Sequence, residues 1–145
     1  MQKIPLEIID LQGDGYHLLV KVNLFDHDFN MVVDTGASKT VVDKNTLLHS
    51  GIPEEQFEDT NVLSTGLGTT NMQSFIIDIP ELRIGEWKIK HFTTAVLDLS
   101  SINYAYEQMG LEPVIGVLGG DILRRFGAHI DYRKLLLTLR DRAVR

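Results

Sequence analysis

The chain has 145 residues, 43% of them hydrophobic, which suits a single domain (residues 1–145) with a buried core. Fourteen basic residues against twenty acidic ones give a net charge of -6, so we expect neither nucleic acid nor membrane as a partner. Cysteine is absent, which excludes disulfides, thiolate metal sites and a cysteine nucleophile.

Short β-prone runs separated by glycine and polar residues predict an all-β domain with one or two short helices. The runs at residues 4–12 and 16–24 flank Gly13-Asp14-Gly15, which predicts a hairpin. A polar break at residues 25–30 then leads into a strand at Met31–Asp34.

The next third of the chain predicts a helix and two further hairpins. Asp43 is expected to cap a short helix that Gly51 ends. The acidic residues 54–63 are expected to be a surface connection. Two glycines at positions 66 and 68 indicate a hairpin tip, and a second turn is predicted at Ile84-Gly85-Glu86. We expect the nearby aromatic side chains Trp87 and Phe92 to pack on the sheet.

The last third predicts two helices around an apolar strand. Residues 100–113 have apolar side chains at Ile102, Tyr106 and Met109, which indicates a short helix that Ser100 or Ser101 caps. The apolar residues 114–120 precede the segment Asp121–Gly127, predicted as a helix with Asp121 as its cap. A terminal hairpin is expected to turn near residues 132–134.

Asp34 is an unusual residue to find at the end of the apolar run Met31-Val32-Val33. A strand entering the core there would hold the carboxyl partly out of water, which disfavours its charged form. Thr35 offers a hydroxyl, and Gly36 lets the backbone come close to a ligand. Asp-Thr-Gly on its own fits a reactive carboxyl and an ordinary turn equally well.

The order of these motifs resembles the retropepsin-like aspartic proteases over nearly the whole chain. A hairpin from Leu6 to Leu24 precedes the loop "VVDTGASKTVV", Val32 to Val42, and a glycine-bearing hairpin follows at Ser64 to Met72. The element "GVLGGDIL", Gly116 to Leu123, a short helix and a terminal strand pair complete the pattern. The resemblance implies a closed acid-protease β-barrel or sandwich and an aspartic endopeptidase.

The resemblance implies catalytic roles for Asp34, Thr35 and Gly36, in which water is activated between two aspartates, one charged and one protonated. The chain has one Asp-Thr-Gly and no Asp-Ser-Gly. The other aspartates considered lack a following Thr/Ser-Gly, lie at an expected cap or precede a turn: Asp10, Asp78, Asp98, Asp121 and Asp131. The prediction is therefore a symmetric homodimer in which each copy supplies Asp34.

The resemblance also implies two supporting elements. The strand residues Val117, Leu118 and Gly119 would cross beneath the active-site loop. The hairpin residues Gly66, Leu67, Gly68 and Thr69 would form a flap that binds the peptide substrate, although a two-glycine hairpin is more often only a hairpin.

The sequence departs from the viral members in two places. Ser38 and Lys39 stand where those proteins have acidic residues that bind substrate backbone. The segment Leu97 to Pro113 is longer than in the smallest members. It could line the cleft, extend the dimer contact or cover the sheet, and its helical apolar spacing favours the last.

Other chemistries are not indicated. The histidines show no paired ligand spacing, so we expect surface or strand side chains and no metal or cofactor: His17, His27, His49, His91 and His129. A peptide-binding or dimerisation domain without turnover is the alternative function, since fold does not fix function. The expected partners are a polypeptide substrate and a second copy. Without a signal-like N-terminus, a cytoplasmic location is expected, although a removed signal would leave no trace.

Overall fold

The structure is a computed structural model that describes residues 1–64 and 72–143. In chain order the elements are β1 (Gln2–Asp10), β2 (Tyr16–Leu24), β3 (His27–Val33), β4 (Val41–Asp43), α1 (Lys44–His49), the 3-10 turn η1 (Glu54–Gln56), β5 (Glu58–Ser64), β6 (Met72–Ile84), β7 (Trp87–Leu97), α2 (Ser100–Gln108), β8 (Gly116–Leu118), α3 (Gly120–Arg125), β9 (His129–Asp131) and β10 (Leu136–Leu139). The predicted all-β class is confirmed, with three short α-helices in the described residues rather than one or two.

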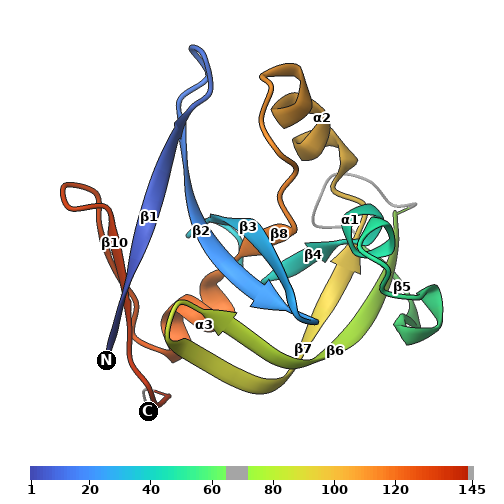
Figure 1. The fold of residues 1–145 in the computed structure, drawn as a ribbon. Helices are drawn as coiled ribbons and strands as arrows, with labels where there is room; N and C mark the ends of the chain where they lie inside the picture. The colour runs from blue at the N-terminus through green and yellow to red at the C-terminus, as the bar shows by residue number, and fades with distance from the viewer. Residues whose placement is uncertain (65–71, 144–145) are drawn as a thin grey trace.

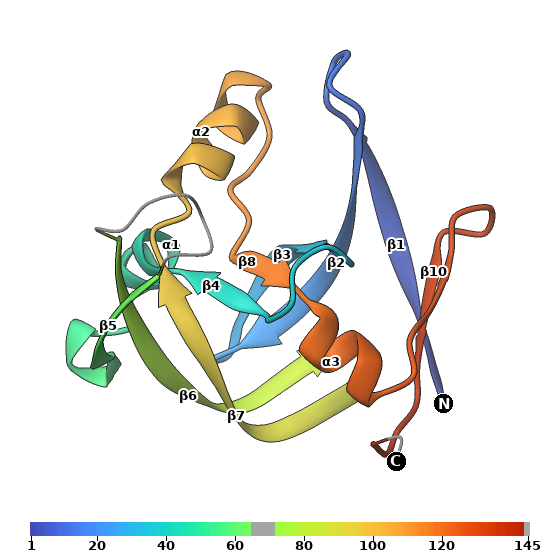
Figure 2. The ribbon, with the colours of Figure 1, turned by 180° about the vertical axis from the view of Figure 1, so that it is seen from behind.

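The strands form one continuous sheet in the order β5-β6-β7-β4-β8-β3-β2-β1-β10-β9. A further pairing between β2 and β6 closes six of them into a barrel: β2, β3, β4, β6, β7 and β8. The β1–β2 hairpin and α2 both project from one end of this barrel (Figures 1 and 2). None of the helices in the described residues combines the length and the apolar character needed to cross a membrane.

The first three strands form the predicted meander, with one difference. Gly13 and Gly15 adopt positive φ in the β1–β2 turn, as their positions suggested. The β2–β3 turn contains only Phe25 and Asp26, both with positive φ, and Leu24 pairs directly with His27. The prediction of a six-residue polar break was therefore wrong, because a two-residue turn already reverses the chain.

The acidic segment at residues 54–63 was also predicted wrongly in part. Its first residues form η1, but Glu58–Ser64 is the edge strand β5. Strand β5 pairs with β6 from Glu58↔Ile76 to Ser64↔Met72. This pairing is possible because β6 is long enough to extend past the barrel. The antiparallel pairing of the two strands agrees with the predicted hairpin, while its tip and the predicted flap residues Gly66, Leu67, Gly68 and Thr69 lie outside the described residues.

The longest hairpin, β6–β7, turns at Gly85 as predicted, where φ is +60°. Its ladder is interrupted once, between the pairs Ile79↔Phe92 and Glu81↔Lys90. Pro80 has no N–H to give to the ladder, and His91 opposite it has a φ of +53°. The hairpin therefore accommodates the proline by an irregularity.

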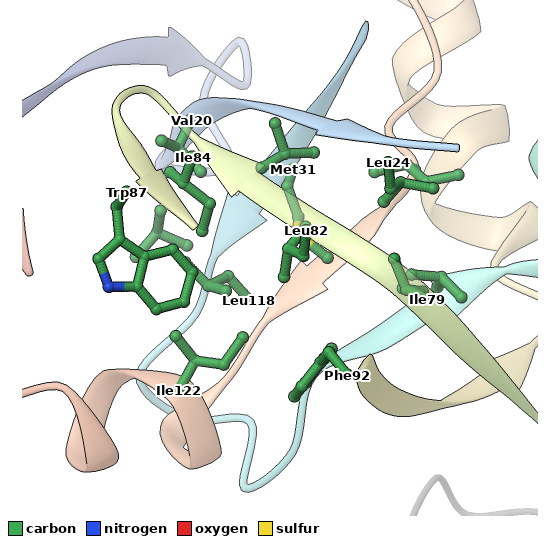
Figure 3. Packing of buried hydrophobic residues seen from close by; sticks show 14 of the residues in the cluster. Val20, Leu24, Met31, Ile79, Leu82, Ile84, Trp87, Phe92, Leu118 and Ile122 are labelled. Carbon is green, nitrogen blue, oxygen red and sulfur yellow. The ribbon is translucent and has the colours of Figure 1, made fainter. Parts of the chain in front are cut away.

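Apolar side chains fill the barrel interior (Figure 3). Trp87 is 1% exposed, stacks edge-on against Phe126 at 4.9 Å between ring centroids, and donates its indole N–H to the Arg140 carbonyl at 3.0 Å. Phe92 is also buried. Both aromatic predictions are confirmed.

A second apolar cluster lies on the outer side of β2, β3 and β8. It contains the buried residues Leu19, Val32, Tyr106, Val114 and Val117, with Ile102 and Met109 packed against it. The helix α2 therefore covers the sheet with the apolar positions predicted from its sequence. Its N-cap is Leu99, not Ser100 or Ser101. The N–H of Leu99 donates to Asp43 and that of Ser100 donates to Asp98.

Candidate active site

Strand β3 places Asp34 at the end of the barrel. Val32 and Val33 pair in parallel with Val117 and Leu118 of β8, and the Asp34 N–H then donates to the Leu118 carbonyl at 3.0 Å. Parallel pairing brings together two segments that are far apart in the sequence. The predicted supporting strand thus lies directly beside the loop that carries Asp34.

The loop folds back on the Asp34 carboxyl. The Gly36 N–H donates to Asp34 Oδ1 at 2.9 Å, and the Ala37 N–H donates to the Asp34 carbonyl at 3.2 Å. A Cβ added at Gly36 would lie 3.2 Å from Oδ1, so glycine keeps the backbone close to the acid. This turn orients one carboxyl oxygen, and the other has no hydrogen-bond partner among the described residues.

The expectation that Asp34 is partly dry was wrong for the single chain. Asp34, Thr35 and Gly36 are all exposed, since they follow the strand and project from the barrel instead of entering it. In the stretch from Met31 to Gly36, the buried residues are the three before the acid, Met31, Val32 and Val33. Within one chain, none of the residues that the structure describes withdraws this carboxyl from water.

Gly119 and the start of α3 hold the far side of the loop. The Gly120 N–H donates to the Ala37 carbonyl at 2.8 Å, and the Asp121 N–H donates to the Ser38 carbonyl at 3.1 Å. A Cβ at Gly119 would lie 2.6 Å from the backbone of Lys39, closer than real Cβ contacts. Glycine is thus required for this approach.

The prediction that Asp121 caps α3 was wrong, because Gly119 occupies the N-cap position. The Asp121 carboxylate turns to the loop, where Oδ1 accepts from the Thr40 N–H at 2.9 Å and from the Thr40 hydroxyl at 2.7 Å. The Thr40 hydroxyl oxygen also accepts from the Gly119 N–H at 3.0 Å. Thr40 is 2% exposed, and the hydrogen bonds around its buried side chain connect the loop to α3.

A hollow of about 420 Å³ lies beside Asp34 and Thr35. Its walls come from the start of β2, the end of β3 and the β9 region: Tyr16, His17, Leu18, Val32, Val33, Ile130 and Tyr132. Among the described residues, Asp34 is the one carboxylic acid in this lining. The hollow therefore offers one acid where acid-pair chemistry needs two.

The other aspartates are used elsewhere. Asp43 caps α1 as predicted, is 1% exposed, and also accepts from the Leu99 N–H at 2.8 Å. Asp131 Oδ1 accepts the N–H groups of Arg133 and Lys134, both at 2.9 Å, in the β9–β10 turn. In the part of the chain that the structure describes, no three histidine, aspartate or glutamate side chains gather as metal ligands do.

Two links between distant segments were not anticipated from the sequence. Thr40 and Asp121 meet across the loop, and Asp43 joins α1 to α2. A hydroxyl or carboxylate beside a glycine-rich turn is the only local signal for such bonds, and it does not identify the partner.

The family comparison agrees with this geometry. The aspartyl protease family model matches residues 20–122, which include the Asp34 loop and the whole of β8. The chain belongs to the aspartyl protease family. No curated protein matches the sequence.

Solved structures show the same fold. A retropepsin-like aspartic protease from Rickettsia conorii superposes with a TM-score of 0.60 at 24% identity, covering 99% of this chain and 92% of that one. The retroviral protease-like domain of Ddi1 from Leishmania major gives 0.59 at 18% identity, covering 85% and 87%. The EIAV protease, solved with the inhibitor HBY-793, gives 0.54 at 19% identity, covering 85% and 99%. The fold is therefore retropepsin-like.

Proposed function

We propose that this protein is an aspartic endopeptidase that acts as a homodimer, with one Asp34 from each copy. The observation that carries the proposal is the exposed Asp34 carboxyl on a loop held by backbone bonds to Leu118 and α3. The hollow beside it has no second acid in the described residues. A second copy on a two-fold axis supplies that acid and covers the exposed loop.

The proposed chemistry follows from two neighbouring carboxyls. Like charges at short distance do not both ionise, so the pair holds one proton between them. The charged Asp34 takes a proton from water, while the protonated Asp34 polarises the scissile carbonyl. Attack of that water on the carbonyl carbon gives a tetrahedral intermediate, and proton transfer to the leaving amine breaks the peptide bond.

Within this scheme, the flanking residues have separate roles. Gly36 fixes one oxygen of Asp34 through its N–H and leaves room for the substrate backbone. Thr35 is exposed next to the acid, and in this proposal it braces the loop of the second copy. The flap role of the hairpin at residues 66–69 remains a prediction.

Cleavage of a mixed peptide library between acid and neutral pH tests the activity. Asp34→Asn is expected to reduce cleavage to background, whereas Asp14→Asn, an exposed aspartate in the β1–β2 turn, keeps full activity. Cleavage that persists in Asp34→Asn refutes the mechanism. Peptide binding without cleavage by the wild type would instead support the alternative of a binding domain without turnover.

Subunit mixing tests the shared site separately. Wild type incubated with a tenfold excess of Asp34→Asn exchanges into mixed dimers that hold one intact Asp34. Random pairing then reduces activity to about a tenth of that of wild type alone. Activity that stays proportional to the wild-type chains would mean that each chain has a complete site. Sedimentation of both proteins, which must show dimers, is the control.

A further inference from the structure

His17 lies in the hollow beside Asp34. It belongs to β2, next to the pair Leu18↔Val33 that precedes Asp34. Its side chain is half-buried and lines the 420 Å³ hollow together with Asp34 and Thr35. A molecule bound in that hollow therefore lies beside His17.

One ring nitrogen of His17 is already occupied. Nδ1 lies 2.8 Å from the hydroxyl oxygen of Tyr106 in α2, and the two rings stack with centroids 5.9 Å apart. Tyr106 is 1% exposed, and burial raises its pKa to about 12, so its hydroxyl keeps its proton. If Nδ1 carried the hydrogen, the buried Tyr106 O–H would have no acceptor among the described residues, which is unfavourable. Tyr106 is thus the donor and Nδ1 the acceptor.

The proton of the neutral ring then lies on Nε2. A neutral imidazole has one donor and one acceptor nitrogen, so a partner that determines the role of one nitrogen also determines the role of the other. Nε2 has no hydrogen-bond partner among the described residues. His17, a residue that lines the hollow, therefore has one unused N–H donor.

The helix that carries Tyr106 is held in place by hydrogen bonds near its start. Asp43 accepts the Leu99 N–H at 2.8 Å before the first turn of α2. Asn103 accepts the Val114 N–H at 2.7 Å and donates to the Val114 carbonyl at 3.1 Å. These bonds attach the start of α2 to α1 and to the segment before β8, and the Tyr106 side chain is itself buried, so its hydroxyl is a fixed point against which His17 is oriented.

We propose that His17 is a substrate-binding residue, whose Nε2–H donates to an acceptor oxygen of the peptide in the hollow, and that Tyr106 is its positioning residue. The proposal rests on the proposed function. It gives the segment from Leu97 to Pro113 a role in the cleft: the helix covers the sheet and, through one hydroxyl, orients a side chain beside Asp34.

Peptide kinetics test the pair with matched variants. Tyr106→Phe keeps the ring and deletes the hydroxyl, while Tyr104→Phe deletes an exposed hydroxyl on the same helix. Tyr106→Phe is expected to raise KM about fivefold, the value of one hydrogen bond, with kcat unchanged. His17→Leu raises KM at least as much, and His17→Gln, which restores an N–H donor, recovers part of the loss. Equal KM values for Tyr106→Phe and Tyr104→Phe overturn the proposal.

Two further measurements separate this proposal from its alternatives. The ¹⁵N spectrum of the His17 ring, which needs no turnover, is expected to show the Nε2–H form in the wild type and a mixture in Tyr106→Phe. An Nδ1–H form in the wild type overturns the proposal. Sedimentation must give the same dimer affinity for both tyrosine variants, because a weaker Tyr106→Phe dimer would assign the effect to assembly. If the wild type cleaves no peptide, the proposed function fails, and affinity for an uncleavable hydroxyethylene peptide provides the same comparison of variants.

Discussion

Gly119 is the position where the close approach of α3 to the active-site loop is most sensitive to a single methyl group. Its φ of -107° suits any residue, so alanine causes no backbone strain of its own. The new Cβ would lie 2.6 Å from the carbonyl carbon and oxygen of Lys39 and 2.9 Å from the Ala37 oxygen. All three are backbone atoms, so relief requires the loop to move away from α3.

The size of the effect follows from what that movement disturbs. Overpacking at a well-packed site costs about 1–3 kcal/mol. Moving the loop also stretches the bonds from Gly119 to Thr40 and from Gly120 to Ala37, each worth about 1 kcal/mol. We therefore expect Gly119→Ala to lower the free energy of unfolding by about 3 kcal/mol and the melting temperature by about 10 °C.

Urea unfolding at a fixed protein concentration measures this change, with Gly120→Ala as the matched control. A Cβ at Gly120 would lie 3.4 Å from the Ala37 oxygen, an ordinary contact, and alanine suits the first turn of α3 better than glycine. The control is expected to be neutral or slightly stabilising. If Gly119→Ala lowers stability by less than about 0.5 kcal/mol, the loop is not held by this approach and the argument is refuted.

Three further substitutions test other parts of the structure. Asp43→Ala leaves the N–H groups of Thr46 and Leu99 unpaired and is expected to cost about 3 kcal/mol in urea unfolding; a loss below about 1 kcal/mol would contradict a linking role. Asp26→Gly relieves a φ of +62° and is expected to raise stability by about 0.5 kcal/mol, and a lower melting temperature would show that its side chain contributes more than its strain costs. Backbone N–H groups of Lys134 and its neighbour lower the pKa of Asp131 from 3.8, so its contribution is present above pH 3.8 and is lost as the pH falls through the folded-state value. Asp131→Ala is therefore destabilising at pH 6, and the difference from wild type narrows below pH 3.8; a constant difference would argue against the carboxylate as its cause.

Much of the fold could be predicted because its signals are local. Glycines at the turns of the first hairpin and at Gly85, and the β-branched run before Asp34, each determine structure within a few residues. The strand β5 was missed because its acidic sequence suits a surface connection, and it is a strand only because β6 offers a partner edge.

The candidate site could be predicted only in part, for a related reason. Asp34 is recognisable from the motif it begins. The bond between Asp121 and Thr40, and the one between Tyr106 and His17, join residues that are distant in the sequence, and neither residue type identifies its partner. The exposure of Asp34 was predicted wrongly because the apolar run before it was taken to continue inward, whereas the strand ends there.

The parallel pairing of β3 with β8 also has a consequence for the order of folding. The β2–β3 hairpin closes a loop of two residues, but the N–H of Asp34 finds its acceptor only at Leu118. Closing so long a segment costs more entropy than closing a hairpin, so the strands before Asp34 assemble early and the loop is fixed late. In pulse-labelling hydrogen exchange, the Asp34 amide should gain protection after those of β2. Any activity of this loop would then arise only once nearly the whole barrel is closed, so that a half-folded chain carries an acid but no assembled site.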